Sequence, residues 1–204
     1  MIFVKHSNKG SILALALAVA LGLAGCTSLV PSPPSNTYDL SAPQSFAGLR
    51  GGSNAQILIL EPSALKILDS QEIVVKPSSS EVEYLAQSQW SDRLPKVVQA
   101  KLIETFENTN KVRAVAKPGE GLVIDYQIVS DIRSFEALVG AQRQALVSIS
   151  VKLVSDRTGK VVRSKVFTES VPISGSGSLD IVLGLDRAFD KVATDLVKWT
   201  FAGV

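Results

Sequence analysis

The chain has 204 residues, of which 46% are hydrophobic, and its 21 Lys and Arg nearly balance 19 Asp and Glu. This length predicts one domain of ordinary size, and the charge balance argues against a nucleic-acid-binding protein, which needs clustered basic residues. A single histidine, His6, and a single cysteine, Cys26, leave few metal ligands. We therefore expect no metal site and no internal disulfide.

Residues 1–25 have the layout of an export signal. Lys5 and Lys9 precede an uncharged apolar run of thirteen residues, 12–24. A membrane-spanning helix needs about 20 apolar residues, so this run is too short to cross a bilayer and is typical of a secretory signal.

The end of this run, Leu23, Ala24, Gly25 and Cys26, resembles the lipobox of bacterial lipoproteins. The resemblance implies that the Cys26 thiol receives a diacylglyceryl group, that a peptidase cuts before it, and that the new N-terminus is N-acylated. Alternatively, a lone cysteine is a small buried side chain, but this position offers no core to bury it. We expect lipid attachment at Cys26 and no cofactor other than these covalent acyl groups.

A proline-rich tract follows the cysteine. Residues 26–36 include Pro31, Pro33 and Pro34, which favour an extended polyproline conformation of about 3 Å per residue. We interpret this tract as a tether that lifts a domain formed by residues 37–204 away from its anchor. A disordered segment with no role in spacing is the alternative.

The first half of the domain is predicted to hold short strands and one helix. The strands are expected at residues 37–40, 56–61, 72–76, 82–87 and 111–116, where β-branched or alternating apolar residues occur. Ser91 or Asp92 is expected to cap an amphipathic helix that ends near Asn108.

The second half is predicted to hold an antiparallel meander and a second helix. Alternating apolar residues favour strands over 122–132, 145–153 and 160–170. The sequence SGSGS at 174–178 precedes a helix over 179–201. It lacks the spacing of a glycine-rich phosphate loop, so we interpret it as a hinge in which Ser178 caps the helix.

These elements predict an α/β fold of α+β type, in which two long amphipathic helices pack on a mostly antiparallel mixed sheet. Trp90 and Trp199 lie near helix ends, where each either completes the core or forms a surface for a partner or a lipid. We expect no catalytic residues, because the domain has no histidine, no free thiol and no G-x-S-x-G motif.

Several segments together carry a family resemblance. They are the lipobox, the proline-rich tether, Tyr38-Asp39-Leu40, residues 67–106 with the sequence QWSDRLP at 89–95, residues 124–137, and a final helix that closes on Trp199. The combination resembles the ABC-type transport auxiliary lipoproteins, the family that includes the auxiliary lipoprotein of the paraquat-inducible MCE system.

The resemblance implies a TolB-like fold and a non-enzymatic subunit that acts beside an MCE-domain protein and an ABC permease and ATPase. Such systems move lipids between the inner and outer membranes. Thr27 follows the cysteine where Asp retains many lipoproteins at the inner membrane, so the implied location is the periplasmic face of the outer membrane. The inner membrane remains an alternative because this sorting rule varies between lineages.

Two other functions stay open from the sequence. One is a membrane-anchored envelope hydrolase or transferase, which unassigned Ser, Lys and Asp residues would serve. The other is a structural lipoprotein of an envelope assembly machine. A homo-oligomer is compatible with each of these functions.

Overall fold

The computed structural model describes residue 2, residues 34–49 and residues 51–204. Residues Ser35–Val204 form one compact unit, which contains the hydrophobic core. Leu23, Ala24, Gly25 and Cys26 lie outside the described residues, as does the rest of the predicted signal.

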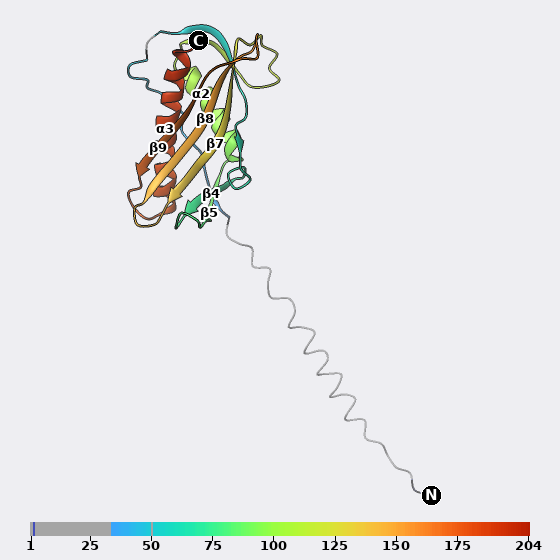
Figure 1. Ribbon diagram of the computed structural model, residues 1–204. Helices are drawn as coiled ribbons and strands as arrows, with labels where there is room; N and C mark the ends of the chain where they lie inside the picture. Colours follow the sequence, from blue (N-terminus) through green and yellow to red (C-terminus); the bar gives the residue numbers. More distant parts are fainter. Residues whose placement is uncertain (1, 3–33, 50) are drawn as a thin grey trace. The chain divides into compact units, whose positions relative to one another are not determined.

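A long strand, β7 (Tyr126–Leu138), organises the sheet. One edge of β7 pairs antiparallel with β8 (Gln144–Ser155) along its whole length, and β8 pairs antiparallel with β9 (Val161–Pro172). These three strands form the meander that the alternating apolar residues predict (Figure 1).

The other edge of β7 is shared by three short strands that follow one another in the chain. They are β2 (Ser53–Ile59), β3 (Ser63–Ala64) and β4 (Glu72–Lys76), and each is parallel to β7. Pro62 lies between β2 and β3 and has no backbone N–H to donate, which accounts for the break between these two strands.

Three further strands complete the nine-stranded mixed sheet. β6 (Val112–Ala116) pairs parallel with β2, β5 (Glu83–Trp90) pairs antiparallel with β4, and β1 (Asn36–Tyr38) pairs parallel with β5. The predicted α+β class is confirmed. The long pairings are antiparallel and most of the short ones are parallel.

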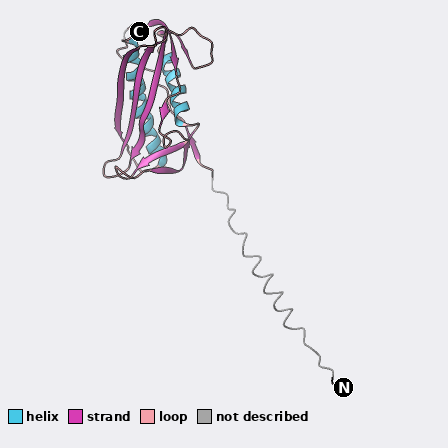
Figure 2. Cartoon of the chain, turned by 45° about the vertical axis from the view of Figure 1, so that its right-hand side comes forward, coloured by secondary structure: helices cyan, strands magenta, loops and turns pink. Residues whose placement is uncertain are grey.

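Two helices, α2 (Leu94–Asn108) and α3 (Ser178–Phe201), cover one face of the sheet, as both views show (Figures 1 and 2). Along β7 the buried side chains alternate with half-exposed ones, and a bulge between Ile132 and Ser134 keeps Phe135 on the buried side. Burial of these apolar faces is the main stabilising contribution. Within the described residues, neither helix is both long and apolar enough to span a membrane.

The predicted strand over 122–132 is wrong at both ends, since β7 begins at Tyr126 and continues to Leu138. Gly119 and Gly121 adopt φ of +96° and +70°, which directs the chain through a turn before the strand begins. Leu122 and Val123 are 42% and 80% exposed, so the apolar alternation extends into a loop whose side chains face solvent.

Both predicted helix caps are wrong. The residue before α2 is Arg93, which makes no side-chain cap, and Pro95 lies in the first turn. Before α3, Gly177 is the N-cap and donates its N–H to the Asp180 carboxylate at 2.9 Å, whereas Ser178 is already helical. Because the Asp180 carboxylate already lies at this helix N-terminus, the SGSGS segment offers no vacant anion site.

Candidate functional site

The sequence QWSDRLP, residues 89–95, joins the end of β5 to the start of α2 and contacts three other parts of the fold. Gln89 Nε2 donates to Thr37 Oγ1 in β1 at 3.3 Å. The backbone N–H groups of Trp90 and Leu94 donate to the carbonyl oxygens of Gln71 and Ser70, at 2.7 and 2.9 Å. The segment therefore holds β1 and the turn before β4 against α2.

Trp90 lies in the core and forms no part of the protein surface. Its side chain is 1% exposed, and its ring meets the ring of Phe135 edge to face with centroids 5.7 Å apart. Of the two roles considered for Trp90, the structure therefore shows completion of the core and excludes a surface for a partner or a lipid. β5 continues three residues beyond the predicted strand, to Trp90, and this places the indole on the side of the sheet that the helices cover.

Ser91 connects the segment to the first strand of the domain. Its N–H donates to the Tyr38 carbonyl at 2.7 Å, and its hydroxyl donates to Asp39 Oδ1 at 3.0 Å. The other oxygen of Asp39 lies 3.1 Å from Lys101 Nζ of α2. This chain of contacts ties the start of the domain to the helix.

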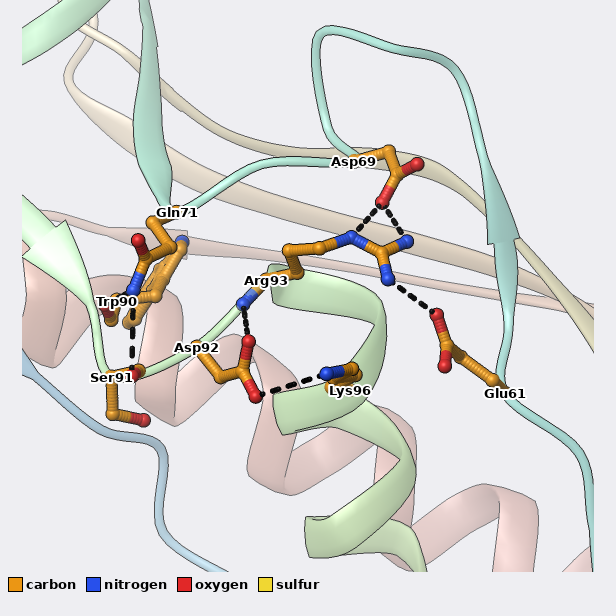
Figure 3. A network of polar contacts seen from close by, with 8 residues as sticks. All are labelled: Glu61, Asp69, Gln71, Trp90, Ser91, Asp92, Arg93 and Lys96. Carbon is orange, nitrogen blue, oxygen red and sulfur yellow. Dashed lines mark hydrogen bonds and ion pairs between the residues drawn. The ribbon is translucent and has the colours of Figure 1, made fainter. Parts of the chain in front are cut away.

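Arg93 is the centre of a group of charged side chains at the start of α2, which we name the α2 N-terminal network (Figure 3). Its Nε and Nη2 donate to Asp69 Oδ1, and its Nη1 lies 3.2 Å from Glu61 Oε1. Beside it, Asp92 accepts the Arg93 N–H at 2.6 Å and pairs with Lys96 at 3.5 Å. Glu61, Asp69, Asp92, Arg93 and Lys96 make up the network.

The pKa shifts at this end of α2 favour the charged forms. A hydrogen bond from the Arg93 N–H lowers the pKa of Asp92, and the bond to Asp69 raises the pKa of Arg93. Burial raises the pKa of Asp39, but bonds from Lys101 and Ser91 outweigh it and lower that pKa overall. Proton transfer near neutral pH needs groups with pKa values near 7, so these residues are suited to ion pairing.

We expect Asp39→Asn to remove part of the pH dependence of stability. The folded pKa of Asp39 lies below the ordinary 3.8, so its ionised form stabilises the fold above that pH and the contribution is lost as pH falls below it. The side chain is 52% exposed, so we expect a loss of only about 0.5 kcal/mol at pH 7, and none near pH 2. Urea unfolding at several pH values measures this difference.

Lys101→Met provides the control, because it removes the partner and leaves the carboxylate. If Asp39 and Lys101 stabilise the domain only through their ion pair, the variant that carries both substitutions has about the same free energy of unfolding at pH 7 as the less stable single variant. Fully additive losses would show that Asp39 and Lys101 stabilise the domain independently.

Trp199 is partly exposed near the end of α3. Its ring meets Phe167 edge to face at 5.6 Å, and the Arg163 guanidinium stands 4.9 Å from its centroid. Arg163 Nη1 also donates to the Trp199 carbonyl at 2.9 Å. The indole packs on β9 and stays partly exposed, so a surface role for Trp199 remains a prediction.

Over residues 34–49 and 51–204, no group of three or more His, Cys, Asp or Glu side chains lies close enough to hold a metal ion. Cys26, the predicted lipid attachment site, and His6 lie outside the described residues.

The α2 N-terminal network was not predicted from the sequence. Its members come from distant segments, 24 residues apart for Arg93 and Asp69, and the one sequence signal was the QWSDRLP segment.

Comparison with known proteins gives one family. The family model described as "ABC-type transport auxiliary lipoprotein component" matches residues 38–197. A solved structure from Xanthomonas campestris, of a DUF330 protein, superposes with a TM-score of 0.78 at 25% identity and covers 83% of this chain and 96% of that one. The family match begins at Tyr38, the last residue of β1, and includes the QWSDRLP segment and most of α3.

Two relatives add partial matches. An uncharacterised protein of Bradyrhizobium diazoefficiens is 32% identical over 168 residues, 82% of this chain, and this chain spans 45% of its length. An isochorismatase-like protein of Emericella nidulans is 32% identical over 111 residues, 53% of this chain and 80% of that protein. This shorter match leaves the assignment unchanged, because the family model covers the domain from β1 into α3. The chain belongs to the family of ABC-type transport auxiliary lipoprotein components.

Proposed function

We propose that this chain is a non-catalytic lipoprotein subunit of an MCE-type ABC transport system that moves lipids between the inner and outer membranes. It acts by docking to partner proteins while acyl groups on Cys26 hold it at the periplasmic face of the outer membrane. The observation that carries the proposal is the family match over residues 38–197, which spans most of the compact unit Ser35–Val204.

The chemistry of the α2 N-terminal network supports docking over catalysis. Its acids and bases are matched in ion pairs, and the shifts in pKa hold Asp92 and Arg93 in their charged forms. Charged side chains at a surface set the orientation and rate of protein association more than they set affinity. We therefore propose this network as the docking surface for an MCE-domain or ABC permease subunit.

Partial exposure of the network fits this role. The side chains of Arg93 and Lys96 are 41% and 49% exposed, and that of Asp92 is 53% exposed. These three side chains can form an ion pair with a partner in place of a present one while α2 stays folded. The buried side chains of Trp90 and Leu94 hold the segment in the core.

Recovery of partners from the envelope tests the proposal. The full chain, carrying an affinity tag, is extracted from crosslinked envelopes in mild detergent and its partners are identified by mass spectrometry. We expect an MCE-domain protein together with permease or ATPase subunits. Recovery of the chain with none of these subunits would contradict the transport role, and recovery with an assembly machine would favour that alternative.

Arg93→Ala tests the docking surface. We expect it to lower partner recovery while the chain remains folded and anchored, because it removes the side chain that joins Glu61 and Asp69. Arg133→Ala is the matched control. Arg133 is 54% exposed and stands 3.9 Å from one carboxylate, Asp131, on β7. Equal recovery by the two variants would exclude the network as the docking surface.

A further inference from the structure

β9 (Val161–Pro172) is a long edge strand whose outer side is unpaired among the described strands. It pairs with β8 alone, and its only register irregularity lies near its start, opposite Leu153 and Val154. From Arg163 to Val171 the strand is regular and free of proline. Free edges of this length are usually shielded by prolines, bulges or charges, or are paired with another strand.

Two charged residues of this edge have no ion-pair partner among the described residues. Lys165 and Glu169 of β9 form none of the salt bridges of the domain, and neither does Asp195 of α3. They line one groove of about 140 Å³ between the strand edge and α3, together with Phe167 and Val192. Lys165 Nζ stands 4.7 Å from the centroid of the Phe167 ring.

We propose that β9 of a second copy of this chain adds to this edge, antiparallel, about a two-fold axis at Phe167. In that register Lys165 of each copy lies opposite Glu169 of the other, beside the groove that contains Asp195. Opposite charges in directly facing positions stabilise a strand pair, and the two-fold axis forms this pair twice.

The other registers lack this complementarity. An axis at Lys165 places two like charges opposite each other, which is unfavourable. An axis at Val166 pairs Arg163 with Glu169, but Arg163 already donates to the Trp199 carbonyl at 2.9 Å and stacks on its ring. An axis at Thr168 leaves Lys165 opposite Val171. Lys165 and Glu169, which have no ion-pair partner within the described residues, therefore favour the strand pairing whose two-fold axis lies at Phe167.

Disulfide trapping between two full-length chains tests the pairing. In the proposed register Val166 of one copy lies opposite Thr168 of the other, and both side chains are exposed on the face away from Phe167. V166C and T168C are placed on separate chains with different tags and oxidised in intact envelopes. We expect a mixed disulfide dimer. Chains without an added cysteine give the background from Cys26.

V162C combined with T168C is the matched control, because Val162 is an exposed valine on the same strand but four residues out of register. We expect roughly tenfold slower trapping for this pair, since about 3.3 Å per residue separates the thiols by more than a disulfide allows. Equal trapping of both pairs, or of neither, would overturn the proposal.

Charge reversal provides the second measurement. K165E in both chains turns two opposite-charge pairs into two like-charge pairs, so we expect the initial rate of V166C–T168C trapping to fall about tenfold. E169K is expected to act likewise, and K165E with E169K in the same chain restores the rate. A double variant no faster than the single variants would also overturn the proposed register.

Discussion

Trp90→Ala is expected to destabilise the domain by about 3–5 kcal/mol, since removal of a large buried aromatic side chain leaves a cavity. The indole is 1% exposed and packs edge to face on Phe135, whose ring in turn lies 6.2 Å from that of Phe189 in α3. A domain of this size is stable by only about 5–15 kcal/mol, so the loss is a large share of the total. Urea unfolding measures it.

Trp199→Ala is the control for this prediction. Trp199 is partly exposed and packs mainly on Phe167 and Arg163, so we expect its loss to cost less than half as much. The chain has two tryptophans, so Trp90→Phe and Trp199→Phe each leave one fluorescent reporter. Equal quenching of the two reporters by acrylamide, or equal destabilisation by the two alanine variants, would contradict the burial of Trp90.

The helices and the meander could be predicted because their periodicity is local. The buried stripe of α3, including Leu185, Phe189, Val192 and Leu196, repeats at helical spacing, and β8 alternates over its length. Periodicity indicates which face of an element is buried, but it carries no information about its neighbours. The parallel pairing of β2, β3 and β4 along β7 joins segments far apart in the chain, so no local pattern could predict it.

The caps and the network were missed for related reasons. Ser91, Asp92 and Ser178 are all good cap residues by type, but a tertiary contact engages Ser91, and local contacts replace the caps expected of Asp92 and Ser178. Ser91 binds Tyr38 and Asp39, and Asp180 supplies the carboxylate that binds Gly177. For the network, Arg93 and Asp69 are 24 residues apart in the chain and meet only because the fold brings the turn before β4 to the start of α2, so no local pattern could predict their ion pair.

The QWSDRLP segment combines residues that hold the fold together with residues that belong to the proposed docking surface. Trp90 and Leu94 are buried, and Ser91 bonds to the first strand, so half of the motif is needed for folding. Asp92 and Arg93 stay partly exposed at its outer side. A substitution at Trp90 would therefore act through lower stability, whereas Arg93→Ala tests the proposed docking with less effect on the core.

Cys26→Ala is expected to leave an unprocessed and unlipidated precursor that no longer incorporates radioactive palmitate. In the proposed lipidation the Cys26 thiol receives the diacylglyceryl group, and alanine cannot replace its nucleophilic sulfur. One acyl chain gives marginal membrane binding, at about 0.8 kcal/mol per buried CH₂, whereas several chains anchor a protein stably. The expected result is therefore a precursor that retains residues 1–25, measured by its larger mass and by palmitate labelling.

Thr27→Ala is the matched control, since it changes the neighbouring residue and keeps the thiol. We expect this variant to be cleaved before Cys26 and labelled like the natural chain. Thr27→Asp addresses location separately, because Asp at this position is expected to retain the lipidated protein at the inner membrane when the two membranes are separated by density. Normal labelling of Cys26→Ala would exclude lipid attachment at Cys26, and the proposed docking role would then require another means of reaching the membrane.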